Sequence, residues 1–181
     1  MNLRHGAIGV SLVLLLEACS STAPSGPPMP SSTAATRSVL PQPVDEAKER
    51  AVAAYLGMWG DMADAALTSD WQSPKLALNA TGDALSRISR GLYADHYNGL
   101  VTKGKPVNHP MVESVEPPAA PTTVDIVDCG DDSQWLKYRA DTGRQADDGP
   151  SGRRHIDAKV KKAVDGSWKV VDFAIQDVGT C

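Results

Sequence analysis

The residues with the most distinctive chemistry in this 181-residue chain are its cysteines and histidines. The histidines are far apart in the sequence, and none stands at metal-ligand spacing from a cysteine or from another histidine: His5, His96, His109 and His155. We therefore expect no metal site. The sequence also lacks a glycine-rich phosphate loop and a serine in a nucleophile elbow, so we expect no cofactor. The three cysteines remain as the residues whose positions predict chemistry.

The first cysteine, Cys19, follows an N-terminal stretch that has the features of an export signal. Residues 1–18 have a short basic start, with Arg4 and His5, followed by an uncharged apolar run of ten residues over 7–16. A run of this length is too short for a permanent transmembrane helix and is typical of a signal peptide. It ends in Leu16-Glu17-Ala18-Cys19, which resembles the lipobox of bacterial lipoproteins. This resemblance implies cleavage before Cys19 and a diacylglycerol on its sulfur.

The alternative is ordinary signal cleavage, which requires small residues at positions −3 and −1. Ala18-Cys19-Ser20 meets this requirement, and Glu17 occupies a lipobox position that usually carries a small residue or Val. Both routes take the protein out of the cytoplasm. We expect a lipid anchor at Cys19 on the extracytoplasmic face of the cell membrane, and a secreted protein if Cys19 is not lipidated.

The rest of the chain divides into a tether and one domain. Residues 19–43 contain the anchoring cysteine and a Pro/Ser/Ala-rich segment whose composition predicts disorder. Residues 44–181 are long enough to form a single core. The net charge of −4 gives the protein no electrostatic reason to bind nucleic acid.

Cys129 and Cys181 remain as a pair once Cys19 is lipidated or removed. In an exported protein, an isolated cysteine pair is far more often a disulfide than a redox or metal site. We therefore predict a Cys129–Cys181 disulfide that holds the C-terminal end of the domain.

Helical spacing precedes strand alternation within the domain. Apolar residues recur at helical spacing from an N-cap at Asp45 to Leu67, and again from Pro74 to Tyr97, where Gly82 allows two shorter helices. The second helical stripe consists of Leu78, Leu85, Ile88 and Leu92. After Pro106 the period becomes two and predicts strands over 111–115, 122–129, 134–140, 153–164 and 167–177. This order predicts an α+β fold, with N-terminal helices packed on a curved antiparallel sheet.

Several short motifs strengthen this fold prediction. They are Ala80-Thr81-Gly82-Asp83-Ala84-Leu85, Gly104-Lys105-Pro106, Val127-Asp128-Cys129, Trp135-Leu136, Trp168-Lys169-Val170 and Val178-Gly179-Thr180-Cys181. With the element order, they resemble a group of small secreted actinobacterial lipoproteins that have a nuclear transport factor 2-like domain. The resemblance implies a sheet that bends around the helices into a cone.

The same superfamily includes ketosteroid isomerase, scytalone dehydratase and polyketide (SnoaL-like) cyclases, which use Asp, His and Tyr inside an apolar cavity. Burial prepares such a carboxylate for proton transfer by raising its pKa. The resemblance implies a cone interior lined by Tyr55, Trp59, Tyr93, Asp95, His96, Asp125, Trp135 and Tyr138. No residue-level motif of those enzymes occurs in the sequence, so no catalytic residue is assigned.

Two functions therefore remain open. The first is a non-catalytic envelope protein whose domain binds a protein partner or supports an assembly at the membrane. The second is a small-molecule-binding protein, or an isomerase-, dehydratase- or cyclase-like enzyme, that uses the cone interior. A cone closed by its own side chains would favour the first function, and an open cavity walled by Trp59 and Trp135 would favour the second.

Overall fold

The computed structural model describes residues 42–146 and 149–181. The predicted signal peptide, Cys19 and nearly all of the predicted tether lie outside the described residues. So does a short part of the polar loop between the fourth and fifth strands.

Three helices open the described part of the chain: α1 (Pro43–Ala66), α2 (Leu76–Asn79) and α3 (Gly82–Tyr97). Helix α1 begins two residues before the predicted cap at Asp45, because Pro43 already has the backbone angle that a first helical turn requires. Asp45 and Glu46 then lie in the first turn, where the helix dipole favours acidic residues. The predicted second helix is two helices, and Gly82 starts α3 with a positive φ of 59°. Leu78 was placed on the buried stripe, but it lies on α2 and is 61% exposed.

Six strands follow: β1 (Leu100–Lys103), β2 (Met111–Glu116), β3 (Thr123–Asp131), β4 (Leu136–Arg139), β5 (Arg153–Lys162) and β6 (Trp168–Ile175). Four of them form one antiparallel sheet in the order β2-β3-β5-β6. The β5–β6 hairpin turns through Gly166, whose φ is 85°, and Ala163 N donates to Ser167 O at 2.7 Å. Register shifts in β2 and between β5 and β6 bend the sheet.

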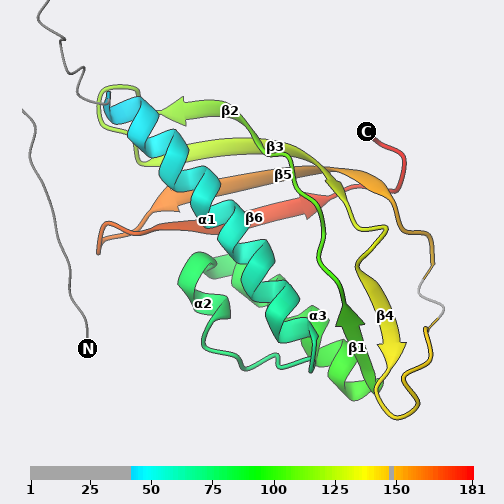
Figure 1. Cartoon of the computed structure of the whole chain (residues 1–181). Helices are drawn as coiled ribbons and strands as arrows, with labels where there is room; N and C mark the ends of the chain where they lie inside the picture. Colours follow the sequence, from blue (N-terminus) through cyan, green and yellow to red (C-terminus); the bar gives the residue numbers. More distant parts are fainter. Residues whose placement is uncertain (1–41, 147–148) are drawn as a thin grey trace, which may run out of the picture. The chain divides into compact units, whose positions relative to one another are not determined.

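Strand β4 is not part of the four-stranded sheet, contrary to the single meander expected from the sequence. It pairs with β1, which the sequence did not predict, in a separate two-stranded sheet. Figure 1 shows this pair beyond the end of α1, beside the end of α3. The prediction of a strand within 134–140 was correct, because β4 lies there. A strand pattern does not determine which other strand it pairs with.

The helices cover one face of the four-stranded sheet, with α1 crossing it diagonally (Figure 1). Helices α1 and α3 both pack on β6, and α1 also contacts β2, β3 and β5. Buried sheet residues meet the helices on this face: Val124, Ile126, Ile156, Ala158, Val160, Trp168, Val170 and Phe173. The predicted fold class is confirmed: the protein is α+β, with N-terminal helices on a curved antiparallel sheet.

Candidate functional site

The interior between α1 and the sheet contains one buried carboxylate, Asp128. Strand β3 alternates strictly between its two faces, and Asp128 lies on the buried face two residues after Ile126. The side chain is 2% exposed. Its Oδ2 accepts hydrogen bonds from Tyr55 Oη at 2.8 Å and from Asn108 Nδ2 at 2.7 Å, and its Oδ1 accepts one from His109 N at 2.7 Å.

These three donors make Asp128 a structural acceptor that joins α1, the segment before β2, and β3. A buried carboxylate needs such partners, because burying a charge without them is costly. Burial first, and then the negative charge of Asp128, raise the pKa of Tyr55 well above its usual value. Tyr55 therefore remains a protonated donor. The hydroxyl of Tyr55 is therefore not poised to act as a base near neutral pH.

Aromatic side chains fill the space next to this network. Trp59 makes edge contacts with Tyr55, Trp135 and Phe173, with ring centroids 6.2, 6.1 and 5.8 Å apart. A cavity of about 40 Å³ lies against Trp59 and Trp135, with Asp132 and Arg154 also in its wall. It has room for roughly one water molecule. The two tryptophans and their neighbours therefore close the interior of the cone.

Both indole N–H groups in this wall are buried and have no hydrogen-bond partner among the described residues. Trp59 and Trp135 also form an edge-to-face ring pair, with centroids 6.1 Å apart. Two unpaired donors are the feature of this interior that an acceptor atom of a bound molecule would satisfy.

Gly130 makes the close packing of this interior possible. A Cβ atom at this position would lie 2.7 Å from Ile156 Cδ1 and 3.1 Å from Asn108 Nδ2. Any larger residue would displace the asparagine that donates to Asp128.

The structure brings together three of the residues that the resemblance placed in the interior: Tyr55, Trp59 and Trp135. Asp125 lies on the opposite face of β3, where it accepts hydrogen bonds from Ser114 Oγ and Lys159 Nζ. Partial burial raises the pKa of Asp125, but the hydrogen bonds from Lys159 and Ser114 outweigh burial and leave it below its usual value. Asp125 is therefore an ionised aspartate on the outer face of the sheet, where it is paired with Lys159.

The other four residues lie at or near the surface around the end of α3. Asp95 pairs with Lys137 Nζ at 3.0 Å, and His96 is exposed. Tyr93 is half exposed between Trp71 and Tyr97, and the ring of Tyr138 lies under Lys103 Nζ at 4.8 Å. These positions do not place them around the cavity beside Trp59.

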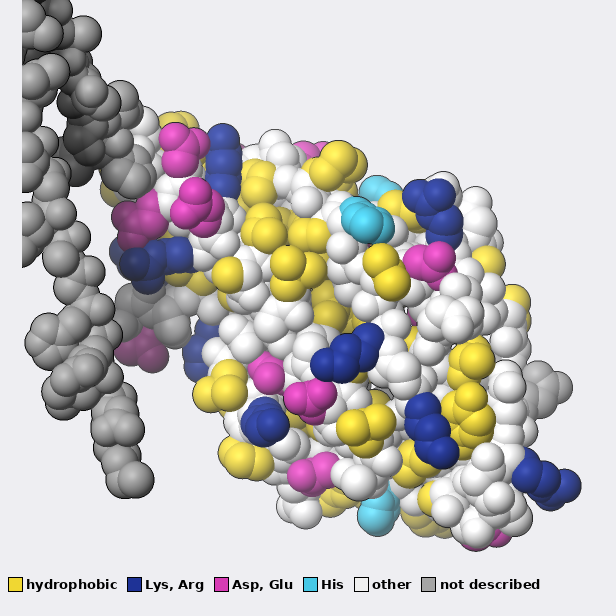
Figure 2. Space-filling model, viewed as in Figure 1, with side chains coloured by type: hydrophobic (Ala, Val, Ile, Leu, Met, Phe, Trp, Pro, Cys, Tyr) yellow, Lys and Arg dark blue, Asp and Glu magenta, His cyan; other side chains and the backbone are white. Residues whose placement is uncertain are grey.

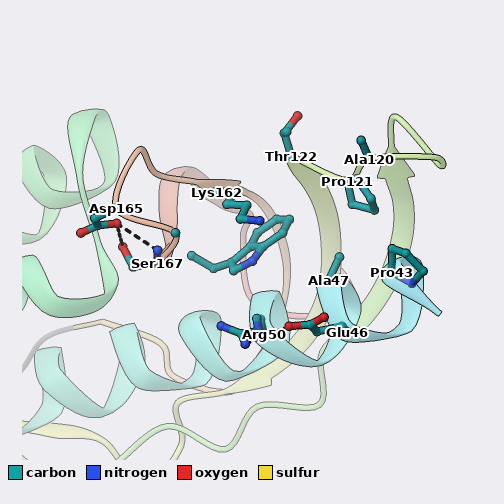
Figure 3. A pocket seen from close by; sticks show the side chains of 12 residues that line it. Pro43, Glu46, Ala47, Arg50, Ala120, Pro121, Thr122, Lys162, Asp165 and Ser167 are labelled. Carbon is teal, nitrogen blue, oxygen red and sulfur yellow. Dashed lines mark hydrogen bonds and ion pairs between the residues drawn. The ribbon is translucent and has the colours of Figure 1, made fainter. Parts of the chain in front are cut away.

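A cleft of about 680 Å³ lies at the beginning of α1 (Figure 3). Glu46 and Arg50 reach it from α1 as an ion pair at 2.8 Å, and Asp165 and Ser167 reach it from the β5–β6 turn. The side chain and backbone N–H of Ser167 hold the pKa of Asp165 below its usual value. The volume would suit a small molecule, but Glu46 and Arg50 are paired with each other and Asp165 is bonded to Ser167. Sequence reasoning missed this cleft because three separate segments build it.

Neither metal ligands nor membrane-spanning helices are found in the described part of the chain. Residues 42–146 and 149–181 contain no group of three His, Cys, Asp or Glu side chains that could hold a metal ion. None of the helices described is both long and apolar enough to span a bilayer.

Comparisons with known proteins add little beyond the fold. No family model and no curated protein matches the sequence. Among solved structures, the intermembrane space region of the chloroplast protein ARC6 is 14% identical, with 70% of this chain and 94% of that chain covered and a TM-score of 0.40. A ketosteroid isomerase-like protein from Erwinia carotovora atroseptica is 11% identical, with coverages of 69% and 91% and a TM-score of 0.39. Structural similarity with TM-scores this low supports no conclusion about activity.

Proposed function

We propose that this chain is an exported, lipid-anchored protein whose α+β domain is non-catalytic and binds a protein partner in the cell envelope. The proposed address rests on the signal-like residues 1–18 and on Cys19 at their end. The Cys129–Cys181 bond supports it, with an S–S distance of 2.09 Å and Cα atoms 5.8 Å apart. Disulfides persist in oxidising compartments outside the cytoplasm.

The filled interior is the observation that carries the non-catalytic assignment. An enzyme that used the cone would need an open cavity and a group able to exchange protons with the substrate. Here the buried carboxylate is occupied by three donors, and the cavity that lies against both Trp59 and Trp135 is about 40 Å³. Cavities that hold small-molecule ligands are roughly ten times larger.

The surface offers some support for a binding role. Tyr97 is 79% exposed and stacks on Tyr93, which in turn packs against Trp71. Tyrosine and tryptophan are enriched among the residues that dominate protein–protein binding energies. On the face that carries α1, hydrophobic side chains also gather beside the helix (Figure 2). Leu56, a residue of α1, is 42% exposed.

One purification tests the anchor and the closed interior together. The full chain is isolated from the membranes of its own host, and its mass is measured under denaturing and then under native conditions. We expect a denatured mass that corresponds to a chain starting at a diacylglyceryl-modified Cys19. The native mass should show no additional small molecule. A soluble chain that starts at Ser21 would disprove the lipid anchor and implicate Glu17.

The small-molecule function is the second candidate, and the two unpaired indole N–H groups favour it. A stoichiometric organic molecule in the native mass, lost in a Trp135→Ala variant, would support it against the non-catalytic role. Trp71→Ala is the matched control, because Trp71 packs against Tyr93 and is absent from the cavity wall.

A further inference from the structure

The Cys129–Cys181 disulfide lies on the outer face of the four-stranded sheet, away from the helices. Cys129 follows Asp128 in β3, so its side chain points to the opposite face from that buried carboxylate. Cys129 is partly exposed, and Cys181 is exposed. A reagent can therefore reach the bond without passing through the core.

One cationic side chain contacts the Cys129 sulfur directly. Arg153 Nε donates to Cys129 Sγ at 3.2 Å. His155 is the residue directly opposite Cys129 in the β3–β5 register, so the two side chains are neighbours on the same face. Two acids lie close to these residues: Asp131 is opposite Arg153 in the register and accepts from Ser133 N at 2.9 Å, and Asp157 Oδ1 lies 3.1 Å from His155 Nε2.

This arrangement makes the two sulfurs unequal. A neighbouring cation stabilises a thiolate, and in thiol–disulfide exchange the sulfur that forms the more stable thiolate leaves faster. Arg153 contacts Cys129 Sγ, and Cys181 is the more exposed residue of the pair. The leaving sulfur and the attacked sulfur are therefore distinguished by their surroundings.

We propose that this bond is a directional exchange site, at which an external thiolate attacks Cys181 Sγ and Cys129 leaves as a thiolate held by Arg153. The attacking sulfur forms a new bond to Cys181 Sγ, and the electron pair of the broken S–S bond moves to Cys129 Sγ. The product is a mixed disulfide at Cys181. Attack by the Cys129 thiolate on Cys181 Sγ expels the external thiolate and restores the original bond.

The residues before Cys181 allow this exchange to proceed within the folded protein. Gln176 N donates to His155 O at 2.9 Å, Gly179 N donates to Arg153 O at 2.8 Å, and His155 N donates to Thr180 Oγ1 at 2.9 Å. These bonds hold the C-terminal segment along β5 independently of the disulfide. After exchange, Cys181 therefore stays close to Cys129, and the reverse step remains fast.

The experiment treats the folded, oxidised full chain with reduced glutathione, quenches with acid, alkylates free thiols and maps the products by mass spectrometry. We expect glutathione on Cys181 and the alkyl group on Cys129. Glutathione on Cys129, equal amounts on both cysteines, or reaction only after denaturant is added would overturn the proposal.

The exchange rate of variants tests the part played by Arg153. Arg153→Gln should slow exchange by about threefold or more, because the leaving thiolate loses the cation that contacts it. Arg153→Lys should recover part of the rate, because it restores a cation. Arg90→Gln on α3 is the control and should not change the rate. Equal rates for wild type and Arg153→Gln, with unchanged thermal unfolding, would show that the guanidinium has no role in exchange.

Discussion

Asp128 and Tyr55 form the pair of residues on which the interior depends. The hydroxyl of Tyr55, on α1, reaches a carboxylate on β3 that is 73 residues away in the chain. Neither residue is at the surface, so both contribute through a hydrogen bond in a medium where an unmade bond is costly.

Tyr55→Phe should lower the free energy of unfolding by about 2 kcal/mol at neutral pH, since it removes one hydrogen bond to a buried charge. The substitution should also change how the free energy of unfolding depends on pH. The raised pKa of Tyr55 keeps the proton on the folded protein, whereas the unfolded chain releases it above a pH of about 10. The wild type therefore loses stability as pH rises beyond that value, and Tyr55→Phe should lose less. Denaturant unfolding at pH 8 and pH 11 measures both effects, and parallel pH profiles would contradict this assignment.

In contrast to Tyr55 and Asp128, we expect Asp95 and His96 at the end of α3 to contribute little to stability. Asp95→Ala removes the ion pair with Lys137 and should cost about 1 kcal/mol or less. His96→Ala removes an exposed side chain and should cost less still. We expect both variants to complement a deletion strain fully. Loss of complementation without loss of thermal stability would restore these residues as candidates for catalysis.

At the scale of elements, sequence patterns predicted the helices and most strands but not all of their pairings. Periodicity located α1, α3, β3, β5 and β6, because each buries a regular stripe on one face. The same alternation contains the signal for Asp128, two positions after Ile126, whereas the predicted Asp125 belongs to the opposite face of the strand. The β1–β4 pair depends on contacts between distant segments, which local patterns do not encode.

Alanine variants of two glycines distinguish the effect of side-chain crowding from the effect of glycine on the backbone. Gly130→Ala in β3 should cost about 1 to 3 kcal/mol, because the new methyl group would press on Ile156 and Asn108. Gly91→Ala in α3 has open space around the new atom and should stabilise the helix by up to about 1 kcal/mol. Thermal or urea unfolding of both variants gives the comparison. Two changes of the same sign would mean that crowding at Gly130 is relieved by small shifts.

At the scale of the whole molecule, the disulfide joins the middle of the sheet to the C-terminal residue across a sequence separation of 52. Cys181→Ser should lower the free energy of unfolding by about 4 kcal/mol in the chain-entropy account. The hydrogen bonds from Gln176 and Gly179 to β5 remain, so the native spectrum of the variant should be close to that of the wild type. Urea unfolding under oxidising conditions measures the loss. A change below about 1 kcal/mol would mean that these hydrogen bonds alone fix the segment.

The place of β6 in the chain has a consequence for when the domain can fold. Helices α1 and α3, which are made first, pack on β6, which is nearly the last segment to be made. The contacts that close the core therefore join the two ends of the domain and cannot form early. A chain that crosses a membrane before folding benefits from this order, because the earlier segments lack the surface against which they would pack. Under the export proposed above, strand β6 delays folding until almost the whole domain is on the far side of the membrane.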